Sequence, residues 1–425
     1  MQFGKILTQA TSMFYKEDHW VVMTFWNSLY IAFFLMPLGI TLPTPFFIIS
    51  IVFGIMMIFR PQKKFVLDKS VLLFPLYFTI MTLSLIYTDD LGSGLNLVQR
   101  SLSLLLFPII FLFVKEDANT VKRLFDFLLV GLIVSFFINI CIASNNLYRY
   151  LIDIKEITGV FMFLEEIVKN WSQFFVGSVF SRSVNANYVS IYILLVLSYY
   201  LKNKLRSRFQ LVVVTLLFLY LFLLASIAAY LILFVMSLLL IFNIVDKEKK
   251  YMMIIVFIMG VALFLGNPRV TNFYERVKDF SKVAAYETTT LEKSRILAWD
   301  ASVKLIKEAP MLGYGVGDAN DVLMKKYKEL GYMPNHENKY NAHNQFLQTY
   351  LQSGIIGFSV LLIIFIVLGM RMKRSRNEFS VFLIVFVSLL FESMLVRFNG
   401  IVFFSIVIPL LLKKRSILSS RIIRN

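Results

Sequence analysis

The run FQLVVVTLLFLYLFLLASIAAYLILFVMSLLLIFNIV, residues 209–245, decides the fold class of this chain. It carries no charged residue, and as one helix rising about 1.5 Å per residue it would be about 55 Å long. A bilayer core is only about 30 Å thick and is crossed by about 20 apolar residues. The run therefore predicts two membrane-spanning helices joined by a tight turn near Ser226.

The whole chain has the composition of a membrane protein. Of its 425 residues, 58% are hydrophobic and 16% are charged, whereas soluble proteins carry nearer a quarter charged residues. The 43 Phe and 20 Tyr suit lipid-facing helices and interfacial belts. The net charge of +17 would suggest nucleic acid in a soluble protein, but these charges lie in short clusters between apolar runs. We therefore expect membrane lipids and no nucleic acid as partners.

Apolar runs of spanning length predict about twelve transmembrane helices in an all-α polytopic protein. The predicted spans are 20–38, 42–59, 71–87, 98–114, 124–144, 184–201, 209–225, 227–245, 251–266, 345–370, 379–395 and 400–412. Lys5 and Lys16 precede the first of them, and no small-residue cleavage site follows it. This pattern indicates a retained signal-anchor helix.

The basic residues between the spans predict the orientation. Each even-numbered span is followed by a cluster of Lys and Arg, whereas short odd-numbered loops such as 88–90 lack one. The positive-inside rule then places both termini in the cytoplasm.

The same count divides the chain into three parts. Residues 1–266 hold helices 1–9 with an interfacial amphipathic segment at 145–183, residues 267–344 form a large outer (periplasmic) loop, and residues 345–425 hold helices 10–12 and a basic cytoplasmic tail.

The outer loop is long enough for a small helical unit. Residues 291–308 have an amphipathic pattern that Pro310 ends. Its predicted apolar side consists of Ile296, Leu297, Ala301, Leu305 and Ile306. The glycines of 313–317 predict a turn and not a nucleotide-binding loop, since no strand precedes them. Residues 318–330 predict a second helix.

His343 is the strongest candidate for chemistry, because it lies where the outer loop enters the tenth span. An imidazole exchanges protons near neutral pH, so it can accept a proton from a hydroxyl nucleophile. The structural alternative is an interfacial histidine that caps a helix. His336 and His343 without a clear carboxylate partner make a weak metal site, and we expect no metal and no cofactor.

Arginines on the outer side form the second candidate set, because the planar guanidinium binds phosphate through a fork of donors. Arg182 and Arg397 each adjoin a span, and Arg295 lies on the amphipathic loop helix. Glu392 and Arg397 flank the last outer turn, where they form either an ion pair that holds the turn or a contact to substrate.

Four pieces of sequence together resemble the O-antigen ligase and Wzy-type polymerase superfamily. They are Arg295 with Trp299, the segment 310–315, the run 343–347 leading into 354–357, and the segment 392–404. The similarity is densest over about 290–400. The preceding spans match only in their number and in the segment 185–188 after Arg182.

This resemblance implies a metal-independent, inverting glycosyl transfer at the outer face of the bacterial cytoplasmic (inner) membrane. The donor would be a glycan on undecaprenyl diphosphate, and the acceptor would be a sugar of the lipid A core in a ligase or another lipid-linked glycan in a polymerase. The family's loop histidine corresponds to His343 as general base, and its loop arginine to Arg295 as a diphosphate ligand. Arg182 and Arg397 are further candidate diphosphate ligands, with Asn344 and Glu392 in support.

One position departs from the family pattern. Many members carry a cation directly after the serine at the turn between spans seven and eight, whereas Ser226 is followed by Ile227 here. Arg182 or Arg397 would have to replace that cation, and without it a catalytically inactive scaffold stays an alternative.

A polysaccharide or lipid transporter is the competing function from another class. Transporters commonly place ionisable residues near the bilayer midplane. Here the interiors of the predicted spans are nearly free of charge, which favours the enzyme.

Overall fold

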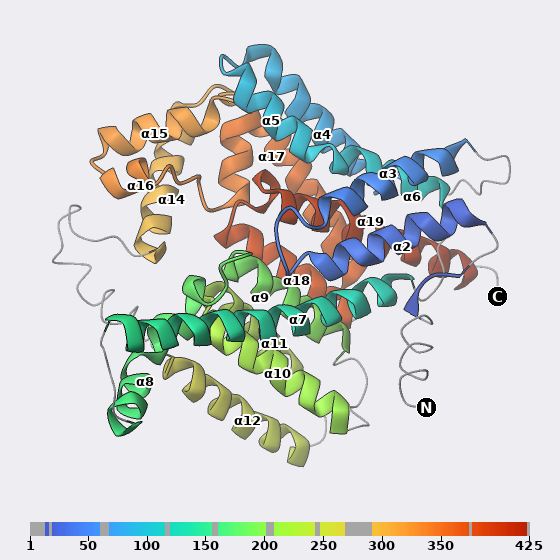
Figure 1. Ribbon diagram of the computed structural model, residues 1–425. Helices are drawn as coiled ribbons and strands as arrows, with labels where there is room; N and C mark the ends of the chain where they lie inside the picture. The colour runs from blue at the N-terminus through green and yellow to red at the C-terminus, as the bar shows by residue number, and fades with distance from the viewer. Residues whose placement is uncertain are drawn as a thin grey trace. The chain divides into compact units, whose positions relative to one another are not determined.

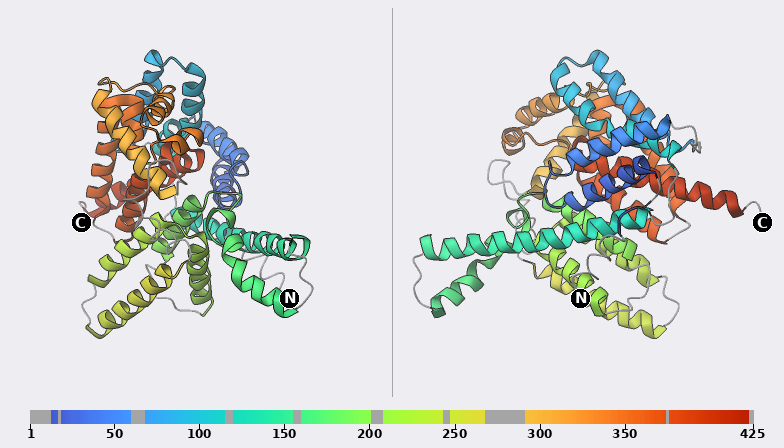
Figure 2. Two further views of the ribbon diagram at one scale, coloured as in Figure 1. Left: turned by 90° about the vertical axis from the view of Figure 1, so that its left-hand side faces the viewer. Right: turned by 45° about the vertical axis from the view of Figure 1, so that its right-hand side comes forward.

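The computed structural model describes residues 13–16, 19–59, 68–114, 120–154, 160–200, 208–242, 247–267, 291–373 and 376–422, and these ranges are helical without a strand. The chain forms two compact units (Figures 1 and 2). The first comprises Met1–Ala32, Thr44–Leu124 and Lys282–Asn425, and the second comprises Phe33–Pro43 and Phe125–Ser281.

The first unit contains the helices at the two ends of the chain. Its long helices are α2 (Trp20–Leu35, whose last turn belongs to the second unit), α3 (Thr44–Ile58), α4 (Leu73–Leu83), α5 (Leu91–Ser101), α6 (Ser103–Phe113), α14 (Leu291–Glu308), α15 (Ala319–Glu329), α17 (Gln345–Met372), α18 (Arg376–Phe391) and α19 (Phe398–Ile422). Short helices are η1 (Ser84–Tyr87), α16 (Met333–Glu337) and η5 (Met394–Val396). Helix α6 packs against α3, α4 and α19 in the core of this unit.

The second unit contains the middle of the chain. Its helices are α7 (Thr120–Arg149, in this unit from Phe125), η2 (Tyr150–Ile154), α8 (Val160–Phe175), η3 (Gly177–Val179), α9 (Ala186–Tyr200), α10 (Arg208–Leu224), α11 (Ile227–Phe242) and α12 (Lys247–Leu265). The break predicted near Ser226 is confirmed, because α10 ends at Leu224 and α11 begins at Ile227. Ala225 makes this turn in the left-handed region, with φ of 47°.

Every predicted span overlaps at least one helix, and span 98–114 includes parts of both α5 and α6. Three helical stretches in the described ranges are long and apolar enough to cross a bilayer, namely Leu91–Phe113, Thr120–Asp153 and Gln345–Met372. Eight of the other nine spans correspond to shorter apolar helices, and the remaining span, 251–266, lies on α12. The count of twelve spans and the cytoplasmic position of both termini stay predictions.

The segment predicted at 145–183 to lie along the membrane surface contains two different helical pieces. Helix α7 continues through Arg149, and α8 is a separate helix over 160–175. Several apolar side chains of α8 are exposed, among them Phe161, Leu164 and Val168. That exposure suits the predicted contact with lipid.

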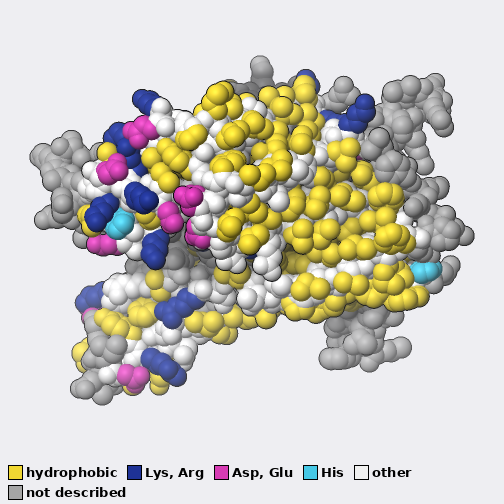
Figure 3. Space-filling model, turned by 90° about the horizontal axis from the view of Figure 1, so that it is seen from above, with side chains coloured by type: hydrophobic (Ala, Val, Ile, Leu, Met, Phe, Trp, Pro, Cys, Tyr) yellow, Lys and Arg dark blue, Asp and Glu magenta, His cyan; other side chains and the backbone are white. Residues whose placement is uncertain are grey.

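The described part of the predicted outer loop folds as a small helical layer on α17. The helix predicted at 291–308 is confirmed as α14, and the one predicted at 318–330 is observed as α15. Their shared core contains Ala298, Ala301, Leu305, Ala319, Leu323, Tyr327, Ala342 and Leu351. In Figure 3 charged side chains gather over α15 and α16, whereas the surface over the neighbouring helices is largely hydrophobic.

The prediction that Ile296 belongs to the apolar, packed side of α14 is wrong. Ile296 is 47% exposed, whereas Ala298 is fully buried and takes part in the core. Close packing of α15 against α14 favours small residues at the contact, so alanines occupy the interface and the larger Ile296 lies outside it.

A polar network on the outer surface of this layer joins α14 to the segment before α16. Lys304 Nζ lies 2.8 Å from Asp300 Oδ2, and the Tyr332 hydroxyl donates to the same oxygen at 2.7 Å. Burial raises the pKa of Asp300, but these two hydrogen bonds outweigh it and hold the pKa below its usual value. Both partners therefore favour the carboxylate form.

The glycine-rich segment after α14 makes the predicted turn and attaches the loop layer to α17. Gly313 and Gly315 have φ of 78° and 96°. The N–H of Tyr314 donates to Leu351 O at 2.8 Å, and the N–H of Ile355 donates to Met311 O at 3.0 Å. These bonds bracket a break inside α17, where Gly354 has φ of 60° and ψ of −153°.

Replacing Gly354 by alanine is expected to lower the free energy of unfolding by about 2–4 kcal/mol. Its backbone conformation is nearly restricted to glycine, and an added Cβ would collide with Met311 O and the N–H of Gly313. The amount of protein in the membrane and its melting temperature in detergent measure the effect. Gly260→Ala is the matched control, because a Cβ on Gly260 in α12 meets nothing within 4 Å.

A partly buried ion pair fixes the opposite end of α17. Arg371 Nη1 lies 2.7 Å from Asp68 Oδ2, and the N–H of Ser70 donates to Asp68 Oδ1 at 2.9 Å. Burial raises the pKa of Asp68, but the hydrogen bonds from Arg371 and Ser70 outweigh it, so the pKa lies below its usual value. This pair ties α17 to the segment that begins α4.

Candidate functional site

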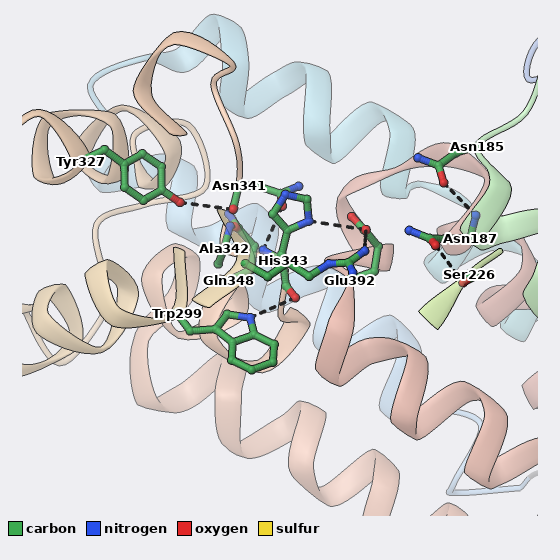
Figure 4. Close-up of polar contacts among 11 residues, drawn as sticks. Asn185, Asn187, Ser226, Trp299, Tyr327, Asn341, Ala342, His343, Gln348 and Glu392 are labelled. Atoms are coloured by element: carbon green, nitrogen blue, oxygen red, sulfur yellow. Dashed lines mark hydrogen bonds and ion pairs between the residues drawn. The ribbon is translucent and has the colours of Figure 1, made fainter. Parts of the chain in front are cut away.

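Three separate elements of the first unit bring His343, Arg295 and Glu392 together, and Figure 4 shows His343 beside Glu392. His343 directly precedes α17, Arg295 lies in the second turn of α14, and Glu392 follows the last residue of α18. His343 Nδ1 lies 3.5 Å and Arg295 Nη2 lies 3.9 Å from the same oxygen, Glu392 Oε2. The sequence named these three residues, and the structure makes them one cluster.

The cluster is shielded from solvent. The side chains of His343, Arg295 and Glu392 are 9%, 11% and 7% exposed. A buried carboxylate is costly unless cations or donors accompany it, and Oε2 of Glu392 has both the Arg295 guanidinium and the His343 imidazole within 4 Å. Because Glu392 faces Nδ1 of the imidazole, Nε2 is the nitrogen left for a substrate hydroxyl.

The backbone of His343 is strained. Its φ of 46° is in the left-handed region, which non-glycine residues adopt only when the surroundings enforce it. Its N–H donates to Asn341 Oδ1 at 3.0 Å, and its carbonyl accepts from Trp299 Nε1 at 3.3 Å. The preceding N–H, of Ala342, donates to Gln348 Oε1 at 3.1 Å. These bonds enforce the conformation that turns the imidazole toward Glu392.

Asn344 is the N-cap of α17. Its Oδ1 accepts from the N–H groups of Phe346 at 2.9 Å and Leu347 at 3.2 Å. Such a cap satisfies donors that a helix start otherwise leaves unpaired. The capping role considered for His343 thus belongs to its neighbour, and the imidazole is available for the cluster.

Tyr327 of α15 supports the same segment from the other side. Burial raises the pKa of its hydroxyl far above the usual value, so the hydroxyl stays protonated. It donates to Asn341 O at 3.4 Å.

The other two predicted arginines, Arg397 and Arg182, form no ion pair with Glu392 within the described residues. Arg397 is exposed and follows η5, and in the described residues the ion-pair partners of Glu392 are Arg295 and His343 rather than Arg397. Arg182 belongs to the second unit, where it is exposed between η3 and α9. Their proposed contact with diphosphate stays a prediction.

The turn that lacks the family's cation is a neutral polar site within the second unit. Ser226 Oγ donates to Asn187 Oδ1 at 2.9 Å, and the N–H of Asn187 donates to Asn185 Oδ1 at 2.9 Å. Both asparagines come from the segment 185–188 that matched the family in the sequence. The contact joins that segment to the turn at Ser226.

The described residues contain no group of three or more His, Cys, Asp or Glu side chains that could hold a metal ion. His336 Nδ1 lies 3.1 Å from Met324 O, and its side chain is half-buried.

The sequence reasoning missed a buried polar stripe at the start of α17. Gln345, Gln348 and Thr349 are fully buried, and their spacing of three and four residues puts them on one face of the helix. Gln348 Nε2 donates to Asn320 Oδ1 of α15 at 3.1 Å. Polar residues at helical spacing inside an otherwise apolar span are the signal that could have revealed them.

Comparison with known protein families supports the resemblance that the sequence motifs indicated. The sequence profile of the O-antigen ligase family matches residues 211–362. The resemblance to the O-antigen ligase family is confirmed. The matched segment contains Arg295, Asn344 and His343, whereas Arg182 precedes it and Glu392 and Arg397 follow it.

A curated relative gives a shorter match. An uncharacterized protein of Haemophilus influenzae is 24% identical over 126 residues, which cover 28% of this chain and 31% of that protein. The chain thus spans about a third of the relative. The family match and the apolar helices together indicate a bacterial membrane protein that is similar to the O-antigen ligase family over residues 211–362.

Proposed function

We propose that this protein transfers a glycan from undecaprenyl diphosphate to an acceptor hydroxyl at the outer face of the cytoplasmic membrane. The observation that carries the proposal is the buried cluster of His343, Glu392 and Arg295, two members of which lie within the family match. A base held by a carboxylate and accompanied by a guanidinium has the parts needed for transfer from a diphosphate.

His343 is the general base in this reaction. Nε2 accepts the proton of the acceptor hydroxyl as that oxygen attacks the anomeric carbon. Glu392, 3.5 Å from Nδ1, orients the ring and stabilises the imidazolium that forms. The imidazole later returns the proton to solvent.

Arg295 supplies positive charge for the leaving group. The bond between the anomeric carbon and the diphosphate oxygen breaks with its electron pair, so negative charge grows on the diphosphate. Within the described residues the buried Nε of Arg295 has no hydrogen-bond partner, which leaves a donor for a phosphate oxygen. Attack opposite the leaving diphosphate inverts the anomeric carbon.

Deleting the gene is expected to change the cell's lipid-linked glycans, and a gel of those glycans tests the class of function. Intact polymer stranded on the carrier lipid indicates a ligase with the lipid A core as acceptor. Single repeat units capping the core indicate a polymerase. Unchanged glycans would contradict both, and the wild-type gene on a plasmid should restore the original pattern.

A further inference from the structure

Gln345, the first residue of α17, has both ends of its side-chain amide in buried hydrogen bonds. Its Oε1 accepts from the N–H of Leu395 at 2.7 Å, and its Nε2 donates to Thr349 Oγ1 at 3.1 Å. The Thr349 hydroxyl lies 2.9 Å from the hydroxyl of Tyr77 in α4. A flipped amide would set its NH₂ against the N–H of Leu395, two donors facing each other, so the contact with Leu395 fixes the orientation.

These hydrogen bonds hold the turn that contains Glu392 in position. Leu395 lies in η5, three residues after Glu392, and the turn between them is closed by the N–H of Met394, which donates to Glu392 O at 3.0 Å. The short segment 343–345 therefore meets the short segment 392–395 at two points. One is Gln345 with Leu395, and the other is His343 with Glu392.

We infer that Gln345 is a positioning residue that sets the carboxylate of Glu392 against Nδ1 of His343. The inference rests on the proposed function, since it assigns Gln345 a role in that reaction. Without the Gln345 oxygen, the fully buried N–H of Leu395 has to find another acceptor, because a buried donor left unpaired is costly. The turn then shifts, and a misplacement of about 1 Å at a catalytic group can cost about 10²-fold in rate.

Gln345→Met tests the inference, because methionine keeps the length of the side chain and removes both hydrogen bonds. The variant is expected to lower kcat by about 10- to 100-fold while the KM for the lipid-linked donor changes by less than about threefold. Initial rates are measured in membranes from a deletion strain that carries each variant, with donor lipid extracted from the same strain. Gln352→Met is the matched control, since Gln352 is 2% exposed on the same helix, and its kcat should change by less than about threefold.

A double-mutant cycle separates positioning from general damage. In a Glu392→Gln background, Gln345→Met should lower kcat by less than about a further threefold, because the residue that Gln345 positions is already changed. The inference would be overturned if the losses in kcat of Gln345→Met and Glu392→Gln multiplied fully in the double variant. It would also be overturned if Gln345→Met were as active as Gln352→Met.

If Gln345→Met does not accumulate in the membrane, Thr349→Val replaces it in the same cycle. Valine matches threonine in shape and removes the hydroxyl that accepts from Gln345 Nε2. A loss of about 3- to 10-fold that disappears in the Glu392→Gln background supports the inference, and an equal loss in both backgrounds contradicts it. Failure of the proposed function is seen separately, as retained activity of His343 variants.

Discussion

Replacing His343 by alanine is expected to abolish glycan transfer while the protein still accumulates in the membrane. Loss of a positioned general base costs about 10²- to 10⁴-fold in rate. The lipid-glycan gel of a complemented deletion strain and an immunoblot of its membranes measure the two quantities. Transfer at the wild-type rate would remove the assignment of His343 as base.

The strained backbone at His343 calls for a second variant. Asparagine is enriched in the left-handed region that His343 occupies, whereas alanine is not. His343→Asn therefore keeps the conformation with φ of 46° and removes only the imidazole. We expect it to be as inactive as His343→Ala and at least as abundant.

His336 provides the matched control for both variants. It lies in the same loop layer, with Nδ1 3.1 Å from Met324 O, and takes no part in the cluster around Glu392. His336→Ala should retain transfer within about twofold. An equal loss in His336→Ala and His343→Ala would show that the loop responds to any loss of histidine.

Replacing Arg295 by alanine is expected to lower the rate of transfer by about 10²- to 10³-fold, the cost typical of losing one donor to a developing negative charge. The change removes the guanidinium proposed to face the leaving diphosphate, and it leaves Glu392 with His343 as its remaining ion-pair partner in the described residues. Rates in membranes from the complemented deletion strain measure the loss. Arg295→Lys should recover part of the activity, because it keeps the charge and loses the planar fork.

Lys304→Ala is the control for removing a positive charge from the same helix. Lys304 pairs with Asp300 at 2.8 Å with its side chain 44% exposed, and exposed pairs of this kind contribute little. Its rate should stay within about twofold of the wild type. The diphosphate role of Arg295 is untenable if Arg295→Ala and Lys304→Ala behave alike.

Much of the helical layout could be predicted from local sequence. The break at Ser226, the stop of α14 before Pro310 and the turn at Gly313 follow from the length of an apolar run, the geometry of proline and the freedom of glycine. Each depends on residues close together in the chain. Ile296 was placed wrongly because periodicity gives the apolar side of a helix but not which of its residues a neighbour covers.

The site could be predicted only as a set of residues. The sequence pointed to His343 by its position at the start of a span, and to Arg295 and Glu392 through the family motifs. It left the partner of Glu392 open, and Arg397 was the nearest candidate in the chain. The structure selects His343 and Arg295 instead, since the start of α17 and α14 come to Glu392 through packing.

The sequence alone therefore identifies the residue types of the site and their neighbours in the chain. The apolar runs by themselves determined where the helices lie, because burial of apolar side chains and satisfaction of backbone hydrogen bonds are requirements of each segment. Only the tertiary structure decided the strained φ of His343, the hydrogen bond from the N–H of Leu395 to Gln345 Oε1, and the carboxylate shared by His343 and Arg295. Those features join segments far apart in the chain, and their geometry exists only once α14, α17 and α18 have packed together.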